Sequence, residues 1–165
     1  MQFHHMCLIV SDLSKAVRLW RDVLGFKIDI EITIPNQPEP GPNTLIYPQA
    51  MDDVFGHRAA RSNMVLLSSP EGALIELQQT VIPEVKKTPN EYLGYGYTGI
   101  RELALSVTDI DSWFKKVRGA GFETTTDYVW PCTTIGRTFT FFDQDRNVIQ
   151  LFEATAGGSS WSTTE

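Results

Sequence analysis

The chain contains one eight-residue pattern twice. Residues 5–12 read His-Met-Cys-Leu-Ile-Val-Ser-Asp, and residues 102–109 read Glu-Leu-Ala-Leu-Ser-Val-Thr-Asp. Each octet begins with a potential metal ligand, continues with strand-forming residues and ends with Asp. An amphipathic helical stretch then runs to Gly-Phe, at 25–26 and at 121–122. The repeat indicates two copies of one supersecondary unit, and the recurring ligand-type residue predicts two half-sites that face one another.

Both copies predict the element order βαβββ. Asp12 is the expected N-cap of a first helix that ends at Gly25, and Asp109 caps a second helix over 110–119. We take both Asp residues as helix caps rather than site carboxylates. From the period-two alternation of apolar residues, strands are expected at 3–10, 26–34, 63–67 and 73–79, and at 101–107, 122–128, 137–142 and 147–153.

The two copies differ by an insertion. We expect a first module over 1–80 that carries a proline-rich insertion at 35–62, a linker at 81–99, a second module over 100–155 and a flexible tail at 156–165. The prolines favour an extended loop over strand pairing. Structureless connections of this length are uncommon and often act as lids or specificity elements.

Composition limits the classes of partner. The net charge of −6 and the absence of a dense Lys/Arg stripe argue against a nucleic-acid partner. No stretch reaches the roughly 18 apolar residues that span a bilayer, so no membrane association is expected. The two cysteines form no CxxC pattern and the start of the chain does not resemble a signal peptide, which favours a cytoplasmic location.

Four positions carry the expected chemistry. His5 and Glu102 begin the first strand of each module, and Glu76 and Gln150 lie in the last strands between apolar neighbours. By alternation, Glu76 and Gln150 point away from those neighbours and from the helix-covered face. One imidazole with three oxygen donors suits a divalent ion that keeps open water positions.

Alternatives remain at these positions. Glu153 is a stronger anion than Gln150, but its parity with Leu151 directs it to the other face unless a bulge intervenes. Glu102 is also compatible with a solvated carboxylate at a strand start, and His5 with an ordinary core or surface residue.

Three further residues are candidates for the substrate pocket. Tyr128 and Trp130 lie near a strand end and its loop, where they line a pocket mouth or serve as core or edge aromatics. His57 lies in the insertion, where a surface position is the alternative.

The repeat, the phased ligands and the closing segments Ala-Leu-Ile-Glu-Leu and Asn-Val-Ile-Gln-Leu resemble the vicinal oxygen chelate superfamily over about residues 3–155. That superfamily includes glyoxalase I, methylmalonyl-CoA epimerase, extradiol dioxygenases and bleomycin-resistance proteins. The resemblance implies an α+β fold in which two tandem βαβββ modules form one cupped eight-stranded mixed sheet, with helices on its outer face and a metal at its centre.

The resemblance also implies roles for the four positions. His5 matches the usual first His ligand and Glu76 the usual Glu or Gln, whereas Glu102 stands where a second His is common and Gln150 where a Glu is common. These two differences from the common ligand types, at Glu102 and Gln150, count against the two-His-one-carboxylate ligand set of Fe(II) oxygenases.

The expected activity is that of a metal-dependent epimerase or isomerase, or of a glyoxalase-type lyase. One divalent ion (Zn, Mn, Co, Ni, Mg or Fe) would act on a small oxygen-chelating substrate, with Glu76 or Glu102 removing a proton next to a carbonyl. The alternatives are a metal-free protein that binds a drug or metabolite, as bleomycin-resistance proteins do, and an Fe(II) ring-cleaving dioxygenase. Because relatives commonly bury sheet edges between subunits, we expect a homodimer.

Overall fold

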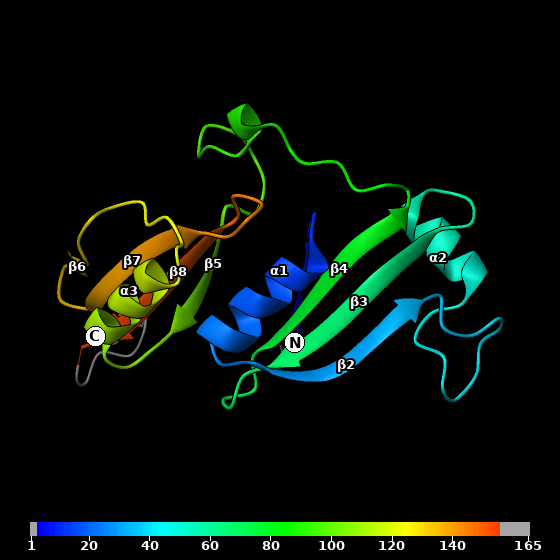
Figure 1. Ribbon diagram of the computed structural model, residues 1–165, viewed down its shortest axis with the longest axis horizontal. Coiled ribbons are helices and arrows are strands. Elements are labelled where there is room, and N and C mark those ends of the chain that lie inside the picture. Colours follow the sequence, from blue (N-terminus) through cyan, green and yellow to red (C-terminus); the bar gives the residue numbers. More distant parts are fainter. Residues whose placement is uncertain (1–2, 156–165) are drawn as a thin grey trace, which may run out of the picture. The chain divides into compact units, whose positions relative to one another are not determined.

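The computed structural model describes residues 3–155 (Figure 1). The described chain divides into two compact units, one that ends at Lys87 and one that begins at Thr88. The predicted α+β class and the βαβββ order are confirmed in both units. None of the helices in residues 3–155 is long and apolar enough to cross a membrane.

The first unit contains a four-stranded mixed sheet in the order β1-β4-β3-β2. Strand β1 runs parallel to β4, and the other neighbours are antiparallel. The strands are β1 (Met6–Ile9), β2 (Lys27–Ile34), β3 (Arg61–Ser68) and β4 (Leu74–Ile82).

The first helix begins where the sequence predicts. In α1 (Leu13–Val17) the side chain of Asp12 accepts a hydrogen bond from the backbone N–H of Lys15 at 3.0 Å, and a π-helical segment, η1 (Arg18–Val23), continues it. Leu19 and Trp20 are fully buried, and α1 contacts β3 and β4. The helix therefore covers one face of the first sheet and leaves the other for the candidate site.

The insertion at 35–62 contains a helix that the sequence analysis missed. Helix α2 (Pro48–Phe55) lies between the end of β2 and the start of β3 (Figure 1). The prolines of the insertion, Pro48 among them, predict an extended loop, yet at the first helical position a proline loses no hydrogen bond, because that N–H has no partner within the helix. Gly56, at a φ of 62°, ends the helix in the left-handed conformation.

The second unit contains the corresponding sheet in the order β5-β8-β7-β6, with β5 parallel to β8. Its helix α3 contacts β7 and β8, and Phe114 meets Phe139 edge to face at 5.1 Å. The elements are a short 3-10 helix η2 (Asn90–Tyr92), β5 (Glu102–Ser106), α3 (Ile110–Gly119), β6 (Trp130–Cys132), β7 (Gly136–Phe142) and β8 (Val148–Ala154).

The strand predicted at 122–128 is wrong in its position. Around Thr124 the chain makes one isolated bridge to Phe141, and the regular strand β6 begins only at Trp130. Between them the hydroxyl of Thr126 donates to the carbonyl of Tyr128 at 2.6 Å. Such local side-chain bonding competes with ladder pairing, which explains the interruption.

The eight strands form two four-stranded sheets rather than the one continuous sheet that was expected. Each first strand pairs with the last strand of its own module, β1 with β4 and β5 with β8, and no ladder joins the two sheets within residues 3–155. The sequence repeat specifies strand pairing within a module. The alternation of apolar and polar residues sets the strand register of each sheet independently of the other.

Candidate metal centre

In the first module, the register places His5 and Glu76 diagonally on one face of the sheet. Met6 pairs with Ile75, and Cys7 pairs with Glu76 on the parallel neighbour β4. His5 immediately precedes β1, two residues before Cys7. It is therefore offset from Glu76 by two positions along the parallel ladder and lies on the same face of the sheet.

The second module repeats this relation. Glu102 pairs with Val148, and Gln150 pairs with Ala104, two residues further along the same parallel ladder. Glu102 and Gln150 therefore share a face in the same diagonal arrangement as the pair in the first module. The repeat in the sequence is thus a repeat of two polar positions on adjacent parallel strands.

His5 and Glu76 are in direct contact. The Nε2 atom of His5 lies 3.4 Å from Oε2 of Glu76, with side chains that are 37% and 17% exposed. Two ligands bound about 2.1 Å from one ion at a tetrahedral angle are about 3.4 Å apart, so this spacing fits a shared divalent ion. The other ring nitrogen of His5, Nδ1, lies 2.7 Å from Nδ1 of His4.

Glu76 also receives two neutral hydrogen-bond donors. The side-chain amide of Gln78 donates to Oε1 of Glu76, and the thiol of Cys7 hydrogen-bonds to the same carboxylate. Desolvation first, then the charge of Glu76 and this hydrogen bond, raise the pKa of Cys7 to about 12. At neutral pH Cys7 is therefore a protonated donor rather than a thiolate ligand. The sequence analysis missed Gln78, although it shares the alternation phase of Glu76.

In the second module a tyrosine contacts the predicted ligand. Glu102 is exposed, and the hydroxyl of Tyr95 donates to its Oε2 at 3.0 Å. Burial, then the hydrogen bond to Glu102 and its charge, raise the pKa of Tyr95 above its ordinary value of 10.0. Gln150 is half-buried between Ala104 and Thr140 on the neighbouring strands. The sequence analysis missed Tyr95 because it lies in the segment read as a linker.

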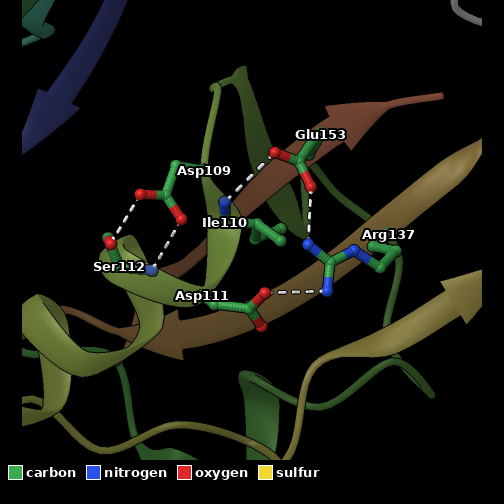
Figure 2. Close-up of polar contacts among 6 residues, drawn as sticks. All are labelled: Asp109, Ile110, Asp111, Ser112, Arg137 and Glu153. Atoms are coloured by element: carbon green, nitrogen blue, oxygen red, sulfur yellow. Dashed lines mark hydrogen bonds and ion pairs between the residues drawn. The ribbon is translucent and has the colours of Figure 1, made fainter. Parts of the chain in front are cut away.

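By strand alternation, Glu153 lies on the face of the second sheet opposite to that of Gln150. Its side chain contacts the start of α3 (Figure 2). Its Oε1 accepts from the backbone N–H of Ile110 at 3.3 Å, and its Oε2 lies 2.8 Å from Nη2 of Arg137, whose Nη1 reaches Asp111 at 2.9 Å. The hydrogen bond from Arg137 is the main cause that lowers the pKa of Glu153. These contacts direct Glu153 toward the helix start rather than toward the face of Gln150.

Gln79 has the equivalent role in the first module. It lies three residues after Glu76, as Glu153 lies three after Gln150, and its Oε1 accepts from the backbone N–H of Leu13 at 3.0 Å. Its amide donates to the carbonyl of Ser11 at 3.2 Å. In both closing strands, therefore, the predicted ligand lies on the site face, and a polar side chain three residues later contacts the N-terminus of the covering helix.

Replacing Glu153 should affect stability and leave metal binding unchanged. In Glu153→Gln the ion pair with Arg137 is lost. Because the pKa of Glu153 is lowered in the folded state, the stability that it contributes is present above its ordinary pKa of 4.5 and is lost as the pH falls through the folded value. We expect the variant to lose less stability than the wild type between pH 7 and pH 3 in denaturant titrations. A loss of metal binding in this variant would instead make Glu153 the fourth ligand.

The predicted pocket residues lie in different settings. Trp130 pairs with Thr138, which pairs with Phe152, so the register puts Trp130 on the same face as Gln150. Tyr128 precedes β6 and is 59% exposed. His57 is exposed just after α2, with its Nδ1 2.8 Å from the carbonyl oxygen of Arg58. Of the three, Trp130 is the one that shares a sheet face with a predicted ligand.

The insertion packs on the site face of the first sheet. Met51 of α2 is fully buried in a cluster with Ile34 and Met64, and Met64 pairs with Gln78 on the adjacent strand. Helix α2 thus forms an apolar wall on the face that carries Glu76. The part of the insertion around α2 is therefore a packed element rather than the expected structureless loop.

Among residues 3–155, no three or more His, Cys, Asp and Glu side chains gather as a metal site. The structure brings His5 and Glu76 into contact and places Glu102 and Gln150 on one face of the second sheet.

Comparisons with known proteins agree with this architecture. The chain is 28% identical to the uncharacterized protein YaeR of Escherichia coli (strain K12), over 92% of this chain and 95% of YaeR. Its fold is similar to that of a glyoxalase family protein from Bacillus cereus, with a TM-score of 0.76, 16% identity and coverage of 94% of this chain and 95% of that one.

A fosfomycin resistance protein, FosX of Listeria monocytogenes, has the same fold, with a TM-score of 0.61, 14% identity and 95% coverage of both chains. The matched structure is a mutant in complex with Mn(II) and 1S,2S-dihydroxypropylphosphonic acid. The model of the Glyoxalase/Bleomycin resistance protein/Dioxygenase superfamily matches residues 2–151. On that match, which covers both modules, the chain belongs to this superfamily.

Proposed function

We propose that the protein binds one divalent ion through His5, Glu76, Glu102 and Gln150 and removes a proton next to a carbonyl of a small oxygen-chelating substrate. The reaction would be that of an epimerase or isomerase, or of a glyoxalase-type lyase. The observation that carries the proposal is the equivalent diagonal placement of a polar pair in each module, with His5 Nε2 and Glu76 Oε2 at 3.4 Å.

The donor set favours Lewis-acid chemistry over redox chemistry. One imidazole, two carboxylates and an amide oxygen suit hard or borderline divalent ions. When bound, such an ion polarises neighbouring substrate oxygens and lowers the barrier to proton removal. Gln78 and Cys7 lie on the same sheet as Glu76, and their hydrogen bonds hold its carboxylate in place. In this proposal Glu76 is therefore a fixed ligand.

Glu102 is the proposed base. It is exposed at the start of β5, so a substrate can reach it, and Tyr95 engages its Oε2. A carboxylate held by one hydrogen bond keeps lone pairs on its other oxygen, which can accept the proton from the substrate carbon. The hydroxyl of Tyr95 then fixes the orientation of the carboxylate.

Metal content and proton exchange test this proposal together. Protein purified without added ions, then titrated with Mn²⁺, should bind one ion per chain. The loaded protein should catalyse deuterium exchange into a member of a panel of hydroxy-ketones and acyl thioesters, and a chelator should stop that exchange. A chain that binds no divalent ion under these conditions would contradict the proposal.

The second candidate is a metal-free protein that binds a drug or metabolite. It is favoured by the two departures from the common ligand types, at Glu102 and Gln150, and by the apolar wall that α2 makes on the first sheet. Ligand binding without any bound ion would support it. An Fe(II) dioxygenase would instead consume oxygen with a catechol-like substrate.

A further inference from the structure

Gln78 is a buried amide with an orientation set by its neighbour. Its side chain is on the site face of β4, and the whole residue is 7% exposed. Its Nε2 must be the atom that faces Oε1 of Glu76, because the opposite orientation would set two oxygen acceptors against each other.

This orientation leaves the other end of the amide without a partner. Oε1 of Gln78 is inaccessible to solvent, and no donor in residues 3–155 reaches it. A buried acceptor without a hydrogen bond costs free energy of folding. The stability of the fold gains little from a glutamine at this position, since the cost of the unpaired oxygen offsets the hydrogen bond to Glu76, and an apolar side chain of the same length would avoid that cost.

The adjacent residue provides the contrast. Gln79 points to the other face and satisfies both ends of its amide, one with the N–H of Leu13 and the other with the carbonyl of Ser11. The two consecutive glutamines of β4 therefore make different contacts. Gln79 joins the sheet to the start of α1, whereas Gln78 donates its hydrogen bond to Glu76, a predicted metal ligand.

We propose that Gln78 is a positioning residue for Glu76, and that it serves metal binding at the expense of the stability of the fold. This inference rests on the proposed function. By donating to Oε1, Gln78 fixes the rotation of the carboxylate and leaves Oε2 directed toward Nε2 of His5. Donors of this kind, one bond removed from the metal, orient the ligands and raise their affinity for the ion.

The test compares Gln78→Met with Gln79→Met. Methionine is unbranched and of similar length, so it fills either position without a polar atom. In Gln78→Met we expect the dissociation constant for Mn²⁺ to rise about 10–100-fold. The thermal midpoint of the metal-free protein should not fall, because the buried unpaired oxygen is removed while Glu76 keeps the thiol of Cys7 and access to solvent.

The control should show the opposite pattern. In Gln79→Met the midpoint of the metal-free protein should fall by about 4–8 °C, as expected for the loss of two hydrogen bonds, with Mn²⁺ affinity within about twofold of the wild type. If Gln78→Met lowers the midpoint as Gln79→Met does, or leaves Mn²⁺ affinity unchanged, Gln78 is structural and the inference is wrong. If the wild type binds no Mn²⁺, the proposed function itself fails and this inference fails with it.

Discussion

Replacement of His5 by alanine should abolish stoichiometric metal binding and leave the fold intact, and Glu76→Ala should do the same. The donor atoms of the two side chains lie 3.4 Å apart on a solvent-accessible face, not in the packed layer under α1. Loss of a direct ligand should exceed the about 10–100-fold cost of losing an outer partner. Elemental analysis and Mn²⁺ titration measure the loss, and circular dichroism with thermal unfolding checks the fold.

His4→Ala is the matched control for this experiment. His4 precedes β1 and its Nδ1 lies 2.7 Å from Nδ1 of His5, so it is an outer partner of the predicted ligand rather than a ligand. Its replacement should weaken Mn²⁺ binding by no more than about 10–100-fold and, unlike His5→Ala, keep stoichiometric binding at saturating Mn²⁺. Full metal occupancy in His5→Ala or Glu76→Ala would show that the first half-site is not part of the metal centre.

Glu102→Gln should separate catalysis from binding. An amide oxygen can still coordinate an ion but cannot take up a proton, so the variant should hold the metal while proton exchange falls about 10²–10⁴-fold, as is typical of a lost general base. The rate is measured as deuterium incorporation into the substrate found in the screen, at saturating metal.

Tyr95→Phe is the companion variant. It removes the hydroxyl that donates to Glu102 and keeps the ring, so exchange should fall less than in Glu102→Gln. Exchange at the wild-type rate in Glu102→Gln would move the base to Glu76 or to a residue of the insertion.

The repeat was sufficient to predict the two modules because each helix and strand that it encodes depends on local rules. Asp12 and Asp109 accept hydrogen bonds from backbone N–H groups in the first turn of α1 and α3, as their positions before the apolar periodicity predicted. The errors fall where local rules are ambiguous. Pro48 can break a helix or begin one, and Met51 resolves this by packing against the sheet.

For the candidate site, the sequence determined which residues share a face. Period-two alternation separates Glu76 from Ile75 and Gln150 from Glu153, and the strand register agrees with both separations. The ligand set itself stays a prediction that the metal titrations test.

The tertiary structure determined which atoms meet. Gln78 donates to Glu76 and Tyr95 to Glu102, and neither contact follows from alternation. The alternation of side chains between the two faces of a sheet follows from the geometry of a single strand, so it can be predicted from the order of residues along the chain. A hydrogen bond between side chains depends on rotamers, on burial and, for Tyr95, on the path of a non-repeating segment, and these exist only after the sheet has formed.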